Sequence, residues 1–422
     1  MRSVERPLRL LYLAHQFYPE YRTGTEKFVL QLAQSMQSQG HQVQVVAYRV
    51  SGLRRWQRWR RWLGMDFWLQ RYTYAGVPVL ALHHLRRPPV YHQQVTDEAE
   101  RAFARRFLKT WRPDLVHVGH AMRVSGFVWA AHDLGIPTVL TLTDYWLLCP
   151  KFNLINSRNE ICQGPAQGAA CQRNCPELET TFIQRRLALA EQIMRSADAV
   201  VAPSAYLARI FQREWSWLTP QVVSYGVRPW TSHRRQYARG DALVFAYAGS
   251  LTRHKGVHTL IEAFRGVQSI AAQLVIYGAG PDEAALHALA ASDLRIRFGG
   301  VYTEQVAGQI FGAMDVLVAP SQWPENRPFI VHEALASGVP VIVSAVGGMA
   351  DAVEDGVTGF VTPPGDVAAL RAVLQRLVDA PEQINKLKNK IAGLTIPTPE
   401  TEADAYATIY RNILGQTHAS AL

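Results

Sequence analysis

Short apolar runs alternate along the chain with longer segments in which apolar residues recur at helical spacing. Residues 10–14 form one apolar run, residues 27–39 carry a helical pattern that ends at Gly40, and residues 41–46 form the next run. Short runs of this kind fit buried strands, and the segments between them fit amphipathic helices. A strand, a helix and a parallel strand in succession make a right-handed βαβ unit. The alternation continues along most of the chain and predicts an α/β protein with doubly wound, Rossmann-like sheets.

The length of the chain predicts more than one domain. Its 422 residues, of which 48% are hydrophobic, exceed what a single core usually accommodates. Residues 228–241 are polar and basic and contain Pro229 and Gly240, as interdomain linkers often do. We therefore predict an N-terminal domain over residues 1–227, a linker over residues 228–241 and a second domain over residues 242–398.

Positive charge is concentrated in one segment that is also rich in tryptophan. The net charge is +10 and the pI is near 9.5, which favours an anionic partner. A helix over about residues 53–70 would carry apolar and aromatic side chains on one face and arginines on the other, as a helix lying in a membrane interface does. The first face would hold Trp56, Trp59, Leu63 and Phe67, and the opposite face Arg54, Arg58 and Arg61; the segment also contains Arg55, Arg60 and Trp62.

Two other interpretations of this segment remain open. The helix can pack against its own domain, or it can bind nucleic acid, which we disfavour because no recognition module accompanies it. The N-terminus reads as a first strand rather than a signal peptide, and no apolar run reaches the length of about eighteen residues that a membrane span needs. We predict a cytoplasmic protein that attaches peripherally to the inner face of the plasma membrane through residues 54–63, with no nucleic-acid partner.

All four cysteines fall in one loop-like insertion over residues 149–176. Four thiols in one irregular segment suffice for a tetrahedral structural zinc site, although the paired spacing of common zinc motifs is absent. The alternative is a reduced or redox-sensitive loop, which suits a cytosolic protein. The four residues are Cys149, Cys162, Cys171 and Cys175.

The most informative stretch runs from Pro320 to Gly348, between two apolar runs. The pattern predicts a strand at residues 316–319, a loop that holds Glu325, a helix that holds Glu333 and a second strand. Here Asn326 is the expected helix cap, with Pro328 in the first turn. Ligands of open α/β sheets bind at the carboxyl ends of strands, where two carboxylates suit sugar and ribose hydroxyls. Taken alone, the two glutamates are better explained as solvated helix side chains.

Further motifs accompany this stretch. They are Gly24-Thr25-Glu26, Gly249-Ser250-Leu251 with Lys255-Gly256, Gly278-Ala279-Gly280-Pro281, Gly338-Val339-Pro340-Val341 and Gly347-Gly348. With these motifs in this order, the chain resembles the retaining, nucleotide-sugar-dependent glycosyltransferases of family four over roughly residues 8–380. The resemblance implies the GT-B fold, in which two Rossmann-like domains face a central cleft. It also implies that the last helix, within residues 399–422, returns to the N-terminal domain.

The resemblance implies roles for particular residues of the donor site. Lys255, with Arg253, would neutralise the leaving diphosphate of the donor. Glu333 would hold the ribose hydroxyls, and Glu325 the hydroxyls of the donor sugar. Tyr302 follows the segment 295–300, which matches the family loop that borders the nucleobase. Backbone amides of the glycine-containing loop and of the loop before the helix would bind phosphates, at Gly24 and at Asn326, Arg327, Pro328 and Phe329.

Three positions depart from the family pattern. Thr143 stands where the family commonly has a histidine near the donor sugar, Ser250 stands where it usually has an arginine, and Asp351 replaces a glutamate. His120 can take over part of the missing histidine's role and Asp144 can act as a polar anchor; the alternative is that His120 is an ordinary loop histidine with its hydrogen bonds satisfied. In the front-face mechanism inferred for the family, an oxygen of the leaving phosphate takes the acceptor proton, so the enzyme mainly stabilises charge.

These observations predict a retaining glycosyltransferase that moves a sugar from a nucleoside diphosphate sugar to a saccharide or lipid-linked acceptor. The expected context is the synthesis of cell-surface polysaccharide or lipopolysaccharide, with no obligatory metal or other cofactor. Two alternatives stay open because of the departures: a noncatalytic subunit that binds a nucleotide sugar, and a GT-B epimerase that acts on one.

Overall fold

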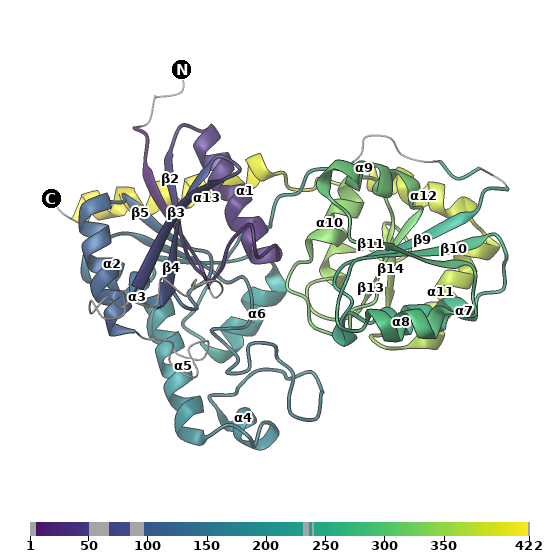
Figure 1. Cartoon of the computed structure of the whole chain (residues 1–422), viewed down its shortest axis with the longest axis horizontal. Coiled ribbons are helices and arrows are strands. Elements are labelled where there is room, and N and C mark those ends of the chain that lie inside the picture. The colour runs from purple at the N-terminus through teal and green to yellow at the C-terminus, as the bar shows by residue number, and fades with distance from the viewer. Residues whose placement is uncertain (1–5, 50–66, 85–96, 231–235, 239, 421–422) are drawn as a thin grey trace. The chain divides into compact units, whose positions relative to one another are not determined.

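The chain folds into two compact α/β units. In a computed structural model, the structure describes residues 6–49, 67–84, 97–230, 236–238 and 240–420. One unit combines Met1–Ser224 with Pro399–Leu422, and the other is Tyr225–Thr398. Each unit has a sheet with helices on it (Figure 1), as the alternation of strands and helices in the sequence predicts.

The sheet of the first unit has eight strands in the order β3-β4-β2-β1-β5-β6-β7-β8. All neighbours are parallel except β3 and β4, which form an antiparallel hairpin at one edge. Leu10–Ala14 of the central strand are buried throughout, as expected of a parallel strand covered on both faces. The strands are β1 (Arg9–Ala14), β2 (Gln42–Tyr48), β3 (Phe67–Tyr74), β4 (Val77–His84), β5 (Leu115–Val118), β6 (Thr138–Thr141), β7 (Ala199–Ala202) and β8 (Gln221–Val222).

Two helices of the first unit are capped by side chains, and the last helix of the chain packs against the first. Asp97 and Ser204 cap α2 and α6 by accepting from the backbone N–H groups of Glu100 and Leu207. The last helix, α13, packs against α1 and so belongs to the first unit, which confirms the predicted return of the chain. The helices are α1 (Gly24–Ser38), α2 (Glu98–Trp111), α3 (Ser125–Asp133), α4 (Ala169–Asn174), α5 (Thr180–Arg195), α6 (Ala205–Glu214) and α13 (Pro399–Ser420).

A buried polar network fastens α13 to the sheet. The Tyr410 hydroxyl lies 2.5 Å from His117 Nδ1 and 3.3 Å from the Tyr12 hydroxyl. On the other side of the imidazole, His117 Nε2 lies 2.8 Å from Thr141 Oγ1, which in turn lies 3.0 Å from the Tyr406 hydroxyl. Burial lowers the pKa of His117 to about 3, so the ring is neutral and has one donor and one acceptor nitrogen for these hydroxyls. The network holds α13 without burying an unpaired charge.

The second unit contains a fully parallel sheet of six strands in the order β11-β10-β9-β12-β13-β14. The strands are β9 (Leu243–Ala248), β10 (Ala272–Tyr277), β11 (Ile296–Gly300), β12 (Val316–Ala319), β13 (Val341–Ser344) and β14 (Gly359–Thr362). The helices are η3 (Arg253–Lys255), α7 (Val257–Arg265), α8 (Glu283–Ala290), α9 (Glu304–Ala313), α10 (Phe329–Ala336), η4 (Ala350–Ala352), α11 (Val367–Asp379) and α12 (Glu382–Ile391).

Three boundaries differ from those expected from the sequence. Residues 67–70, taken as the end of the arginine- and tryptophan-rich helix, begin the strand β3, whose pairing with β4 overrides the helical spacing. The rest of that predicted helix, residues 53–66, lies outside the described residues. Helix α1 begins at Gly24 rather than near residue 27. Residues 296–300, expected in a loop, pair with β10 as strand β11.

A buried ion pair anchors α12 to the sheet of the second unit. Lys388 Nζ lies 3.2 Å from Asp315 Oδ1, and both side chains are almost completely withdrawn from water. The second carboxylate oxygen of Asp315 accepts the backbone N–H of Val244 at the start of β9, 3.0 Å away. The pair thus joins a helix near the end of the unit to two neighbouring strands.

Removing the cation of this pair tests its contribution to stability. We expect Lys388→Ala to lower the free energy of unfolding by about 3–5 kcal/mol, because the Asp315 carboxylate loses its buried ammonium partner. Lys390, exposed on the same helix, is the matched control, and Lys390→Ala should change it by less than about 0.5 kcal/mol. Urea denaturation followed by tryptophan fluorescence measures both, and equal losses in the two variants would contradict the anchoring role.

Candidate functional site

The loop between β12 and α10 brings a lysine and a glutamate together in the second unit. Lys255 Nζ, from the 3₁₀ turn η3, lies 2.5 Å from Glu325 Oε1. The hydroxyl of Ser321 also donates to Glu325 Oε1, at 3.3 Å. The side chain of Glu325 is 10% exposed and that of Lys255 is 25% exposed. The pair therefore lies at the rim of the unit, with the carboxylate turned inward and the ammonium still in contact with solvent.

Two glycines permit the close backbone approach behind this pair. Gly256 has φ of +73°, and a Cβ there would lie 1.9 Å from the carbonyl oxygen of Pro320. Gly347 has φ of +67°, and its Cβ would lie 2.3 Å from the carbonyl oxygen of Glu325. The next residue, Gly348, donates its N–H to that carbonyl at 2.6 Å. Only glycine satisfies both the positive φ and the contact, so these residues fix where Lys255 and Glu325 stand.

His254 and Trp323 complete the surroundings of the ion pair. Their rings meet edge to face with centroids 5.8 Å apart, and Lys255 Nζ also lies 5.8 Å from the centre of the Trp323 ring. The carbonyl of His254 accepts from the backbone of Gln322 at 2.8 Å. Burial, followed by the charge of Lys255, lowers the pKa of His254, which keeps the ring neutral. Neither Trp323 nor Ser321 was predicted from the sequence, because their role depends on the path of the loop.

Glu333 lies on α10 within the same unit and is buried. Tyr302 follows β11 and lies near the carboxylate of Glu333. Burial, followed by the charges of Glu333 and Tyr277, raises the pKa of Tyr302 to about 12. The ring of Tyr302 meets Tyr277 edge to face at 5.8 Å. The structure therefore brings Glu333 near Tyr302, two residues that the sequence placed in one donor site.

The start of α10 differs from the expected capping. Helix α10 begins at Phe329, and Pro328 is its N-cap, so the prediction that Asn326 caps this helix is wrong. The side chain of Asn326 is instead buried in the loop. The ring of Phe329 stacks on Tyr225 with centroids 5.0 Å apart. Pro328 has no N–H to offer a phosphate, which leaves backbone donors of this loop only at its other positions.

Two further residues of the predicted donor site lie in the turn after β9. The carbonyl of Ser250 accepts from the Tyr247 hydroxyl at 2.8 Å, and Arg253 is exposed at the first position of η3. Arg253 is close enough to help lower the pKa of His258, after the larger effect of burial. The arginine therefore lies beside the first turn of α7, in the same basic turn as Lys255.

In the first unit, polar side chains gather after the carboxyl ends of neighbouring strands. His120 follows β5 and Asp144 follows β6, and His120 Nε2 lies 2.9 Å from Asp144 Oδ2. The backbone N–H of Met122 donates to His120 Nδ1 at 3.1 Å, so Nε2 carries the proton given to Asp144. Although burial alone would raise it, the charge and hydrogen bond of His120 lower the pKa of Asp144. The pair is therefore an ionised carboxylate held by an imidazole of fixed tautomer.

His15, after β1, packs its ring on His120 with centroids 4.1 Å apart. His15 Nε2 also lies 3.8 Å from Glu26 Oε1, a carboxylate with no exposure to solvent. Glu26 Oε2 accepts both the N–H and the hydroxyl of Thr23 at 2.6 Å, which forms a capping box at the start of α1. Gly24 is exposed in this first turn, at the loop-to-helix junction where the sequence placed it.

A buried arginine supports the Asp144 loop from behind. Arg186, on α5, donates through Nη2 to the carbonyl of Trp146, and its guanidinium lies 4.2 Å from the centre of the Trp146 ring. The N–H of Trp146 in turn donates to Asp144 Oδ1 at 2.8 Å. Burial lowers the pKa of Arg186 to about 10, which leaves it charged at neutral pH. Sequence analysis missed His15 and Arg186 because both act through contacts between distant segments.

The cysteine segment does not form the zinc site considered from the sequence. Among the residues that the structure describes, no three His, Cys, Asp or Glu side chains are grouped to hold a metal ion. All four cysteines are described and are free thiols, three of them buried. Burial, followed by the charges of the other three cysteines, raises the pKa of Cys171 to about 12, which favours the protonated thiol. The structural zinc interpretation is therefore unsupported.

Two family models match the chain in tandem. The model of "Glycosyltransferase Family 4" matches residues 22–229, and that of "Glycosyl transferases group 1" matches residues 230–392. The chain belongs to the family 4, group 1 glycosyltransferases. The boundary between the two models lies in the segment that precedes β9. The matched residues include His120 and Asp144 in the first unit and Lys255 and Glu325 in the second.

Curated relatives of this glycosyltransferase are similar over part of their length. The alpha-D-kanosaminyltransferase of Streptomyces kanamyceticus is 29% identical over 191 residues, which are 43% of this chain and 48% of that protein. The glycogen synthase of Mycobacterium tuberculosis is 26% identical over 290 residues, which are 65% of this chain and 62% of that protein. The chain thus spans about half to three fifths of the length of these relatives.

Solved structures with the same arrangement of elements confirm the predicted fold. The Anabaena protein HepE, in complex with UDP and glucose, matches with a TM-score of 0.67 at 17% identity and covers 95% of this chain and 99% of that one. Sucrose-phosphate synthase from Thermosynechococcus elongatus matches with a TM-score of 0.68 at 18% identity, over 97% and 100% of the two chains. The glycosyltransferase therefore has the GT-B fold. None of its described helices has both the length and the apolar character that a membrane span requires.

The environment of His15 predicts a dependence of stability on pH. Burial, then the charges of His120 and Arg123, lower the pKa of His15 well below 6.5. Below about pH 6.5 the unfolded chain binds a proton that the folded protein does not, so stability falls with pH, by up to about 1.4 kcal/mol per unit for this group. His15→Gln should remove this contribution, whereas His132→Gln, an exposed control, should not. Urea denaturation at pH 7.0 and 5.5 measures how much the free energy of unfolding changes between the two pH values. An equal change in His15→Gln and His132→Gln would refute the prediction.

Proposed function

We propose that this protein is a retaining glycosyltransferase that moves a sugar from a nucleoside diphosphate sugar to a saccharide or lipid-linked acceptor. The observation that carries the proposal is the pairing of Lys255 with Glu325 at the carboxyl ends of β9 and β12, in a chain that belongs to this family. In parallel α/β sheets the carboxyl ends of strands are where ligands bind. A cation and a carboxylate there suit the diphosphate and the hydroxyls of one donor.

In the proposed donor site each polar residue has a separate task. Lys255 stabilises the charge that develops on the diphosphate as the bond from the sugar carbon to the phosphate oxygen breaks. Glu325 accepts hydrogen bonds from hydroxyls of the donor sugar, and Glu333 accepts them from the ribose. Tyr302, beside Glu333, provides an aromatic surface near the nucleobase. Arg253 adds positive charge to the turn that lacks the usual family arginine at Ser250.

The acceptor side is proposed to lie at the strand ends of the first unit. There the His120–Asp144 pair offers an anionic carboxylate and an imidazole. The acceptor oxygen forms the new bond to the sugar carbon, and its proton passes to the leaving phosphate oxygen, so no protein base is needed. His120 and Asp144 then serve to orient hydroxyl groups, and the N–H groups at the start of α1, near Gly24, bind phosphate.

The setting of the reaction is also a proposal. A lipid-linked or polysaccharide acceptor at the inner face of the membrane agrees with the net charge of +10. HepE was crystallised with UDP and glucose, so UDP-sugars are the first donors to test. Two other activities compete with transfer: binding of a nucleotide sugar without chemistry, and epimerisation of its sugar. Acceptor-dependent release of nucleotide separates transfer from both.

Titration calorimetry with UDP-, GDP- and ADP-sugars tests the donor site. We expect micromolar binding of one donor, weakened about tenfold to hundredfold in Lys255→Ala and in Glu333→Ala, because each loses hydrogen bonds to or from a charged group. Lys386→Ala, an exposed lysine on α12, is the matched control and should bind the donor normally. Absence of binding at up to about 1 mM of every donor, a concentration that corresponds to only about −4 kcal/mol, would refute the assignment.

A further inference from the structure

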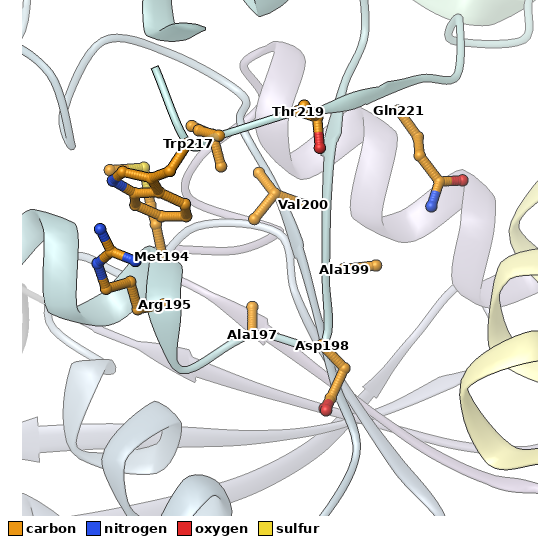
Figure 2. A pocket seen from close by; sticks show the side chains of 10 residues that line it. Met194, Arg195, Ala197, Asp198, Ala199, Val200, Trp217, Thr219 and Gln221 are labelled. Carbon is orange, nitrogen blue, oxygen red and sulfur yellow. The ribbon is translucent and has the colours of Figure 1, made fainter. Parts of the chain in front are cut away.

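A cavity of about 320 Å³ lies in the first unit at the end of α5, beside the starts of β7 and β8 (Figure 2). Its walls include the exposed side chains Arg195, Thr219 and Gln221, together with Trp217 and Val200. These residues stand at the amino ends of β7 and β8. His120 and Asp144 follow the carboxyl ends of the parallel strands β5 and β6. The cavity and this polar pair therefore lie at opposite ends of the strands of one sheet.

The indole of Trp217 is held in place before any ligand arrives. Its Nε1 donates to Glu191 Oε1 at 3.0 Å, and the guanidinium of Arg195 lies 3.9 Å from the centre of its ring. Arg195 Nε donates to the same carboxylate oxygen at 2.9 Å. Figure 2 shows the indole and the guanidinium side by side at one end of the cavity. An aromatic wall fixed in this way loses little conformational freedom on binding, which favours affinity.

The charged groups around the cavity already have partners. Arg195 Nη2 lies 2.8 Å from Glu191, and Asp198 Oδ2 accepts the backbone N–H of Thr138 at 2.7 Å. The remaining polar groups are uncharged: Gln221 offers an amide that can donate and accept, and Thr219 a hydroxyl. Such a lining does not favour a phosphate or a carboxylate over water. It fits a neutral molecule that carries many hydroxyl groups and also has apolar C–H faces.

We propose that this cavity is a binding site for a neutral saccharide, separate from the transfer site. A sugar ring would pack its C–H face on Trp217 and Val200, while its hydroxyls hydrogen-bond with Gln221, Thr219 and the outer edge of Arg195. The volume is at the lower end of the range of small-molecule sites and suits one or two sugar units of a longer chain. The cavity lies at the amino ends of the strands, whereas His120 and Asp144 lie at the carboxyl ends. A saccharide bound in the cavity therefore leaves the site beside His120 and Asp144 free.

Saturation-transfer NMR on the full chain tests the proposal with three neutral probes: maltohexaose, chitohexaose and a mannohexaose. We expect binding of at least one probe with a millimolar dissociation constant, about −4 kcal/mol. Gln221→Ala should weaken it about two- to tenfold, the worth of one neutral hydrogen bond. Trp217→Ala should abolish it by removing the apolar wall. Gln212→Ala, exposed on α6 outside the cavity, is the matched control and should bind like the wild type.

Two further binding measurements distinguish the cavity from the proposed transfer site. Asp144→Asn, at the proposed acceptor side, should leave oligosaccharide binding to the cavity unchanged. Donor binding measured on Gln221→Ala should also be unchanged, so failure here is distinct from failure of the transfer-site proposal. If Trp217→Ala does not fold, the exposed residue Gln221 still carries the test. The proposal would be overturned by no saturation transfer from any of the three probes, by equal binding in Gln221→Ala and Gln212→Ala, or by loss of binding in Asp144→Asn.

Discussion

The second unit is arranged around the ion pair of Lys255 and Glu325. A carboxylate that is only 10% exposed loses most of its hydration, and the ammonium and the hydroxyl of Ser321 replace it. The two charged groups come from turns after different strands, β9 and β12, so their separation depends on how closely those turns approach. Gly256 and Gly347 set that approach, since any side chain there would meet the backbone of the facing loop. The chemistry of the site thus depends on two positions that have no functional group.

The first unit has many buried polar groups on its central strands and just after their carboxyl ends. Most of these groups are hydrogen-bonded to neutral partners. His117 is kept uncharged and connects the hydroxyls of Tyr410 and Thr141, which helps to hold the helix α13 on the sheet. After the end of β6, the carboxylate of Asp144 is hydrogen-bonded to His120 and to a backbone N–H, with Arg186 behind it. Neutral bonds inside and a compensated charge outside keep the cost of desolvation low.

Much of this arrangement follows from the sequence because it is local. The run at Val316–Ala319 was predicted as a strand with the bounds found, since all four residues are apolar and a proline follows. The sequence also placed Glu325 in the loop after this strand and Glu333 in the helix that follows, where the structure has them. It failed where pairing between segments decides the outcome. Residues 67–70 have helical spacing yet pair with β4, and Asn326 is a good capping residue two positions too early for the helix that forms.

Contacts between distant segments also determine where the side chain of Thr143 lies. The hydroxyl of Thr143 donates to the carbonyl of Gly119 at 2.9 Å, so this side chain closes onto the end of β5 instead of reaching outward. His120, the next residue along that strand end, contacts Asp144. The imidazole beside this carboxylate therefore comes from the segment that follows β5. No local motif contains this contact, because residues 120 and 144 become neighbours only when β5 and β6 pair in the sheet.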